Sequence, residues 1–383
     1  MGANMRQAGM NMGRVKQQNR SAILNYICEV GPVSRKDIAS DMGLTPAAVT
    51  QITTQLLEEG ILVEQGTDQT HDGAGRRKVF LDIDDTYQYV YAVNIEAEIT
   101  TVALCDLRGN LVEKQTMCTD HAKAPEHFLE EIANSLLEMG RRAPAKIERR
   151  IAAVTVGIPG LVDVETGVSI HAYGVWEEVV EVSDLLHRQL GLPVFIENNV
   201  DAFARAEVLY GIGRKHDNFL LIKWGPGVGS TIVIDKQIYI GRHGKTAELG
   251  HLIMEHHGEL CNCGRRGCLE TMVSYGALQK IQKFAPEKFG EVYTKSKGTD
   301  REKFDDVIDM FARAIVNAAT ILAPDRIVLS GNLFRSEEIR KQMIEDCFEY
   351  DPNLHAGRIL YTELSSCEDY IGPVAAYVQQ VLF

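Results

Sequence analysis

Residues 248–270 read ELGHLIMEHHGELCNCGRRGCLE, and this segment says most about the fold of the chain. Three cysteines, Cys261, Cys263 and Cys268, fall within eight residues, and two glycines lie between them. Glycine permits sharp backbone turns, so the three thiolates can converge on one ion. A tetrahedral zinc site then needs one more ligand, and a neutral imidazole nitrogen suits it. We therefore predict a closed, structural Cys3His zinc site.

Three histidines stand upstream of these cysteines and are candidates for the fourth ligand: His251, His256 and His257. The residues alone do not choose among them. The alternative is a group of buried or redox-active thiols. The close spacing, the glycines and the preceding histidines favour a metal site.

The segment resembles the zinc signature of the ROK family, named for repressors, open reading frames and kinases. In that family the histidine of a Glu-x-Gly-His motif is the fourth zinc ligand, and this resemblance selects His251. It also implies that Glu248, His251 and Glu270 face the hydroxyls of a sugar. The zinc would then hold a sugar-binding loop in shape. The implied fold is a two-lobed, actin-like or hexokinase-like (ribonuclease H-like) α/β domain.

The composition is that of a globular protein with two or three domains: 383 residues, of which 45% are hydrophobic and 24% charged. Eight cysteines, five of them scattered, do not form a disulfide framework in a chain of this length. No apolar run approaches the roughly 20 residues that cross a bilayer, and no signal-peptide core is present. We expect a cytoplasmic protein with no membrane partner.

The net charge of −13 argues against nucleic-acid contacts spread over the whole molecule. Residues 1–80 hold nine Lys and Arg against eight Asp and Glu, which gives about +1 and leaves about −14 for the rest. Any contact with DNA must therefore be local.

Residues 20–64 carry the signals of three short helices followed by a strand. Apolar residues at helical spacing predict the first helix from Arg20. Ser34 and Thr45 are suited to cap the second and third helices, and Pro46 fits the first position of the third. Helix, glycine-containing turn, helix is the order of a helix-turn-helix motif.

The third predicted helix exposes small and hydrogen-bonding side chains that can approach base edges in a major groove. A strand, a polar loop with glycines and the basic run 76–78 follow, which is the pattern of a wing whose cations contact phosphate. The alternative is a module that only packs, but the order of these features favours DNA binding. The DNA-binding candidates are Ser34, Arg35, Thr45, Ala47, Ala48, Thr50, Gln51, Thr54, Arg76 and Arg77.

This N-terminal segment resembles the winged helix-turn-helix at the front of ROK regulators, which ROK kinases lack. We therefore expect a DNA-binding domain of residues 1–85 that combines helices with a β wing. Residues 86–383 are expected to form the sugar-binding domain, with its zinc motif at 248–270.

From residue 89 onward the sequence repeats one pattern twice: three strands, a helix and a further strand. The expected strands are 89–93, 100–106, 111–115 and 151–156 in the first half, and 219–224, 230–234, 237–240 and 326–329 in the second. The duplication predicts two lobes around a cleft, with ligands at the carboxyl ends of strands.

Loops after these strands supply groups that bond hydroxyls and an indole that can pack on a sugar face. Taken singly, each group is more often a loop cap or a surface polar residue. Their joint order resembles the sugar pocket of the family. The sugar-binding candidates are Gly157, Trp176, Asn198, Asn199, Glu248, His251 and Glu270.

The resemblance to ROK kinases fails at the catalytic machinery. Asn199 stands at the position of the family's general base, an aspartate, and an amide cannot take a proton. The first phosphate loop carries Glu96 and Glu98, which would repel phosphate. In the second loop Pro226 replaces a threonine and has no N–H, and on the adenosine side Asn332 replaces a glycine. We infer a dead nucleotide site beside an intact sugar site.

These observations predict a sugar-responsive transcriptional regulator, a repressor, that is not an enzyme. Its expected partners are operator DNA and a monosaccharide, its expected cofactor is zinc, and its expected assembly is a homodimer or a dimer of dimers on a roughly palindromic site. The alternative is an active ATP-dependent sugar kinase with a regulatory DNA-binding head. A third hypothesis is that the cysteine cluster itself binds DNA as a zinc finger. It is disfavoured because no basic recognition helix follows the cysteines.

Overall fold

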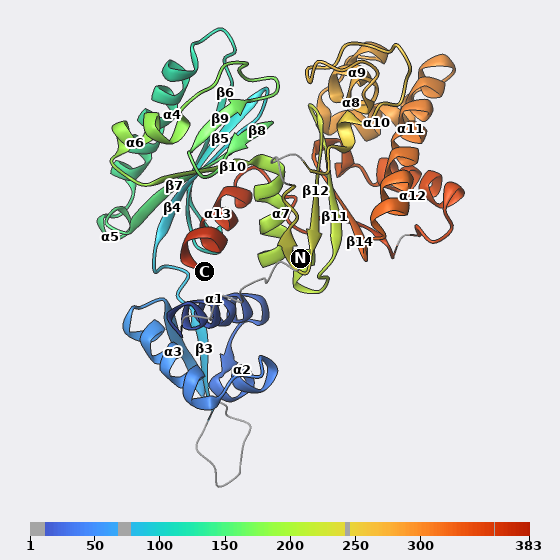
Figure 1. Cartoon of the computed structure of the whole chain (residues 1–383). Helices are drawn as coiled ribbons and strands as arrows, with labels where there is room; N and C mark the ends of the chain where they lie inside the picture. Colours follow the sequence, from blue (N-terminus) through green and yellow to red (C-terminus); the bar gives the residue numbers. More distant parts are fainter. Residues whose placement is uncertain (1–11, 68–77, 242–245, 356) are drawn as a thin grey trace, which may run out of the picture. The chain divides into compact units, whose positions relative to one another are not determined.

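The computed structural model describes residues 12–67, 78–241, 246–355 and 357–383 (Figure 1). The chain divides into two compact units. One contains the residues up to Tyr87 together with Val378–Phe383, and the other is Gln88–Tyr377. None of the described helices is long and apolar enough to span a membrane.

In its described residues the first unit contains three α-helices, a π-helical turn and a small sheet with the strand order β1-β3-β2. The two predicted caps are confirmed, because the N–H of Asp37 donates to Ser34 Oγ and the N–H of Ala48 donates to Thr45 Oγ1. The elements are α1 (Met12–Val30), β1 (Val33–Ser34), α2 (Arg35–Asp41), α3 (Pro46–Glu58), β2 (Leu62–Thr67) and β3 (Val79–Ile83). The chain end, a π-helical turn η5 (Val378–Leu382), belongs to this unit, where the hydroxyl of Ser21 donates to the carbonyl of Phe383.

The larger unit contains two five-stranded sheets with equivalent topology, β6-β5-β4-β7-β10 and β13-β12-β11-β14-β15. In each sheet three consecutive strands form an antiparallel meander, and two further strands are added in parallel. The predicted duplication is therefore confirmed.

The first sheet consists of β4 (Tyr89–Ile95), β5 (Ile99–Asp106), β6 (Leu111–Cys118), β7 (Ile151–Ile158) and β10 (Val194–Asn198). Buried apolar residues of these strands pack against the apolar sides of two helices. The other elements of this half are α4 (Pro125–Arg142), α5 (Ala145–Glu148), α6 (Val182–Leu190), the hairpin of β8 (Leu161–Asp163) and β9 (Val168–His171), α7 (Asn199–Tyr210) and η1 (Ile212–Arg214).

The second sheet consists of β11 (Phe219–Trp224), β12 (Val228–Ile234), β13 (Gln237–Ile238), β14 (Arg326–Ser330) and β15 (Ile359–Tyr361). Its core is aromatic, with Trp224 in edge-to-face contact with Phe289, Phe311 and Phe334. The helices of this half are α11 (Thr299–Leu322), η4 (Asn332–Arg335), α12 (Glu337–Tyr350) and α13 (Ile371–Tyr377). The last of these, α13, packs against α7 and against strands of the first sheet. The cysteine-rich segment enters between β13 and α11, with η2 (Leu249–His251), α8 (Leu269–Val273), α9 (Tyr275–Ile281), η3 (Pro286–Lys288) and α10 (Phe289–Lys295).

Helices α7 and α13 occupy equivalent places after the last strand of each half, and they pack together between the two sheets (Figure 1). Their backbones approach closely at Gly372, where an added Cβ would lie 2.9 Å from the nitrogen of Phe203. Because α7 begins at Asn199, this contact connects the predicted sugar site to α13, the last helix of the unit.

Candidate functional site

Four side chains of the cysteine-rich segment converge: His251, Cys261, Cys263 and Cys268. Their ligand atoms all lie within 4.8 Å of one another. Cys261 Sγ is 3.5 Å from His251 Nδ1, and Cys263 Sγ is 3.6 Å from Cys268 Sγ. Three thiol sulfurs and one imidazole nitrogen are the donor set of a structural tetrahedral zinc site, so the residues present fit this metal.

Glycines shape this cluster as the sequence predicted. Gly264 and Gly267 have φ values of 83° and 72°, in the left-handed region that glycine adopts without strain. A Cβ at Gly267 would lie 1.8 Å from the carbonyl oxygen of Glu255, so no larger residue fits there. The turn therefore requires glycine for both its conformation and its packing.

The structure also selects among the three histidines. His251 alone of the three belongs to the cluster, while the rings of His256 and His257 stand 3.9 Å apart, centroid to centroid. Nε2 of His251 lies 3.4 Å from a carboxylate oxygen of Glu248. A carboxylate on the second nitrogen of a metal-binding imidazole fixes the ring orientation and raises its basicity.

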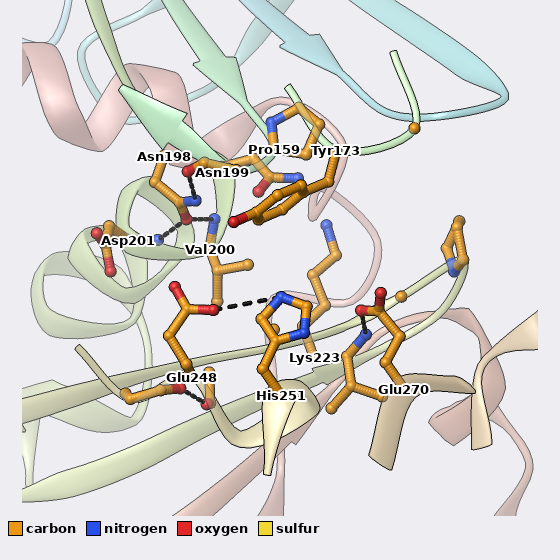
Figure 2. A pocket seen from close by; sticks show the side chains of 18 of the residues that line it. Pro159, Tyr173, Asn198, Asn199, Val200, Asp201, Lys223, Glu248, His251 and Glu270 are labelled. Carbon is orange, nitrogen blue, oxygen red and sulfur yellow. Dashed lines mark hydrogen bonds and ion pairs between the residues drawn. The ribbon is translucent and has the colours of Figure 1, made fainter. Parts of the chain in front are cut away.

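A cavity of about 250 Å³ lies between the two halves of the larger unit, next to this cluster (Figure 2). Both halves contribute to its wall. Five of the seven predicted sugar-binding residues line it: Asn198, Asn199, Glu248, His251 and Glu270. Residues more than 70 positions apart in the sequence are thus brought to one cavity, and the volume suits a monosaccharide-sized ligand better than a larger one.

The two asparagines at the start of α7 have different roles in the structure. Asn198 caps the helix, because its Oδ1 accepts the N–H groups of Val200 and Asp201 at 2.8 and 3.2 Å, and its Nδ2 donates to the carbonyl of Gly160. Asn199 donates through Nδ2 to Glu96 Oε1 at 3.1 Å. Asn198 therefore fixes the loop, and Asn199 binds the carboxylate of Glu96 in the wall of the cavity.

Two predicted sugar-binding residues lie elsewhere. Trp176 is 7% exposed, belongs to the core of the first half and donates from Nε1 to Ser169 Oγ. Its predicted packing on a sugar is corrected, because the indole is part of this core and does not line the cavity. Gly157 does not line the cavity. An added Cβ there would lie 3.4 Å from Cα of Asn199, so the lack of a side chain leaves room for the first residue of α7.

Tyr173 supplies the aromatic ring that the sequence assigned to Trp176. Its ring lines the cavity and contacts the ring of His251 edge to face, with centroids 5.5 Å apart (Figure 2). Burial and the nearby carboxylate of Glu248 raise the pKa of Tyr173 to about 12, so its hydroxyl stays a donor at neutral pH. Tyr173 and Trp176 lie three positions apart in the same loop, so the sequence gave no signal to choose which ring faces the cavity.

Lys223 is a second residue that the sequence reading missed. Its Nζ lies 2.5 Å from Glu96 Oε1, and both side chains line the cavity. Burial alone would lower the pKa of Lys223, but Glu96 and the buried Glu368 raise it. A lysine within the otherwise apolar strand β11 was the available signal. Of the two carboxylates predicted beside the phosphate loop, only Glu96 lines the cavity, and Glu98 is exposed.

Glu270 holds the glycine-containing loop between β11 and β12. Its Oε2 accepts the N–H of Val228 at 2.9 Å, and burial raises its pKa. Within the same loop, the N–H of Gly225 donates to the carbonyl of Gly227. The loop is therefore closed by its own contacts and by a carboxylate.

The first unit presents part of the predicted DNA-binding set on one helix. On α3 the side chains of Ala47, Thr50, Gln51 and Thr54 are exposed, and Ala48 is partly exposed. Ser34 is corrected, because it is 3% exposed and its hydroxyl is used by Asp37.

Arg35 donates to Thr53 and pairs with Glu64, so its side chain is held within the unit. Thr45 is exposed and caps α3. Arg76 and Arg77 lie outside the described residues.

The fold and cavity define a sugar-kinase-like domain joined to a smaller helical unit. The chain belongs to the ROK family, which it matches over residues 90–356. The DNA-binding transcriptional dual regulator NagC of Escherichia coli (strain K12) is 27% identical over 355 residues, which cover 88% of this chain and 86% of that protein. The putative xylose repressor of Caldicellulosiruptor sp. (strain Rt8B.4) is 25% identical over 397 residues, 97% of this chain and 98% of that one. Among solved structures, a ROK family transcriptional regulator described as a homologue of the E. coli MLC protein shares 25% identity, with a TM-score of 0.80 and 96% of both chains covered.

Proposed function

We propose that this protein is a sugar-responsive transcriptional repressor, in which residues 86–383 bind a monosaccharide and residues 1–85 bind operator DNA. Relatives that span nearly the whole chain are named as regulators and repressors, two of them after sugars. The observation that carries the proposal is Asn199, which lines the cavity where a kinase of this family has its base. An amide there can bond a sugar hydroxyl but cannot accept its proton.

The proposed DNA-binding surface is the exposed side of α3. Its small and hydroxyl side chains allow close approach to base edges, and Gln51 can pair with an adenine through its amide. Arg76 and Arg77, beyond the described residues, are proposed to contact phosphate from a wing. A protein that binds operator DNA and a sugar works in the cytoplasm, and this location is part of the proposal.

We propose zinc as the metal of the Cys3His cluster, with a structural role. Three thiolates and an imidazole leave no position open for a substrate, so the ion closes the loop that carries Glu248 and His251 toward the cavity. The chain's own residues then bind and orient the sugar, and the zinc performs no reaction.

The effect of the sugar on DNA is proposed to pass along helices. A ligand that contacts Asn199 acts on the first residue of α7, and α7 packs against α13, which leads directly into the chain end that belongs to the DNA-binding unit. A sugar that favours one arrangement of these helices must weaken operator binding by its differential affinity for the two states. Paired heads in a homodimer or a dimer of dimers would match a roughly palindromic operator.

A kinase with a DNA-binding head is the second candidate, and one pair of experiments separates the two. Selection of bound duplexes from a random DNA pool should recover a defined palindromic site. A coupled assay for ADP release over a panel of free sugars should give no turnover. Turnover would replace the repressor with the kinase, and recovery of unrelated sequences would remove the operator from the proposal.

A further inference from the structure

On the side of the cavity where a nucleotide's phosphates lie in the kinases, two backbone hydrogen-bond donors are already in use and a third position has none. A phosphate is held in such loops by backbone N–H groups and by a cation. Here the N–H of Val228 donates to Glu270 and the N–H of Gly225 donates to Gly227, while Pro226 has no N–H.

The cation of this region, Lys223, also has a partner. Lys223 Nζ pairs with Glu96 Oε1 at 2.5 Å, and the buried Glu368 also acts on it. Glu96 in turn accepts from Asn199, so the lysine, the carboxylate and the amide form one connected group in the wall. A phosphate that approaches Lys223 therefore meets the Glu96 carboxylate at the same nitrogen, and repulsion between the two anions opposes its binding.

The charge of the residues that line the cavity also opposes the binding of a phosphate. Among the lining residues that the structure describes, Lys223 is the one lysine or arginine, against five carboxylates: Glu96, Glu197, Asp201, Glu248 and Glu270. Glu197 is paired with Arg205 at 2.8 Å, so the excess of negative charge comes from the other carboxylates. Like charges at short range in a partly desolvated cavity oppose the entry of an anion.

Resting on the proposed function, we propose that Glu96 and Glu270 are specificity-determining residues that restrict this pocket to an uncharged sugar and exclude its phosphate ester. A sugar hydroxyl needs only hydrogen-bond partners of ordinary strength, which Asn199 and Glu248 provide. A phosphate carries close to two negative charges at neutral pH and finds its donors occupied.

The test is calorimetry on the full-length, zinc-loaded protein. The probes are glucose, mannose and N-acetylglucosamine, each compared with its own 6-phosphate. The free form of the bound sugar should bind at least about tenfold more tightly than the phosphate, as expected for a like-charge penalty in a partly buried site. Equal or tighter binding of a 6-phosphate would overturn this inference and leave the proposed function standing. Absence of binding by every sugar and every phosphate, with xylose added to the panel, would overturn both.

A pair of variants tests the residue assignment. Glu96→Gln removes the carboxylate from Lys223, and it should improve binding of the 6-phosphate relative to the free sugar by about fivefold or more. Glu98→Gln is the matched control, because it removes the same charge two residues away on an exposed side chain. Free-sugar binding by both variants shows that they are folded. An unchanged ratio in Glu96→Gln, or an equal change in Glu98→Gln, would contradict the role of Glu96.

Discussion

At the scale of single residues, the cysteine cluster makes the firmest prediction. Cys263→Ser removes one of four donors, and since metal binding and folding are coupled in such sites, the variant should lose zinc, melt at a lower temperature and lose its response to sugar. Metal analysis, thermal unfolding and calorimetry measure the three effects. Cys118→Ser, at an exposed cysteine outside the cluster, is the control and should match the wild type. A metal-free wild-type protein that binds sugar normally would refute the structural role of the ion.

Asn199→Asp tests whether the lack of a general base is the only feature that prevents phosphorylation of a sugar. We expect no phosphorylation, because Lys223, Val228 and Gly225 remain occupied and a base without a bound phosphoryl donor has nothing to catalyse.

The new carboxylate replaces a hydrogen bond to Glu96 by like-charge repulsion, so we expect a loss of stability of about 1–3 kcal/mol with sugar binding retained. ADP release and chemical denaturation give the two results. Measurable turnover in this variant would reopen the kinase alternative.

At the scale of elements, α3 carries the prediction about DNA. Gln51→Ala removes an exposed side chain that can pair with a base, and it should relax the preference at one base pair by about 1–3 kcal/mol while leaving binding to random DNA nearly unchanged. Gln17→Ala, at an exposed glutamine of α1, is the control. Competition between the selected site and its single-base variants measures the preference. An equal loss on specific and random DNA would remove Gln51 from base readout.

The contact between α7 and α13 carries the prediction about coupling. Gly372→Val places side-chain atoms where the backbone of Phe203 lies 2.9 Å from an ideal Cβ, so the two helices must separate, at a cost of about 1–3 kcal/mol. Sugar binding should persist, and the effect of sugar on operator affinity should shrink. Gly276→Ala serves as the control, because an added Cβ at this position of α9 would meet only Ser274 Oγ, at 3.8 Å. Normal coupling in Gly372→Val would show that the signal takes another route.

The elements themselves could largely be predicted, because their signals are local. The caps at Ser34 and Thr45 lie within three residues of the N–H groups they bind, and the duplicated strand pattern follows from apolar periodicity. What the sequence does not contain is the direction of a side chain in an irregular loop. Tyr173 and Trp176 are both aromatic residues of one loop, and only the fold decides which one reaches the cavity. The Glu96–Lys223 ion pair joins residues that are distant in the chain, so no local sequence pattern predicts it.

At the scale of the whole molecule, the proposed function requires that sugar binding by the larger unit changes DNA binding by the first unit. Two peptide connections join the units, at Tyr87–Gln88 and at Tyr377–Val378, so a rearrangement of α13 can act on the first unit through the second connection as well as the first. A coupling free energy of about 1–3 kcal/mol corresponds to a change in affinity of about 5–150-fold, and the coupling must be reciprocal.

The most direct test is the operator affinity of the full-length protein, measured at one salt concentration with and without a saturating concentration of the sugar that binds in calorimetry. We predict that the sugar weakens operator binding by at least about fivefold, and that operator DNA weakens sugar binding by the same factor. An operator affinity that is unchanged while the pocket is saturated with sugar would contradict the account.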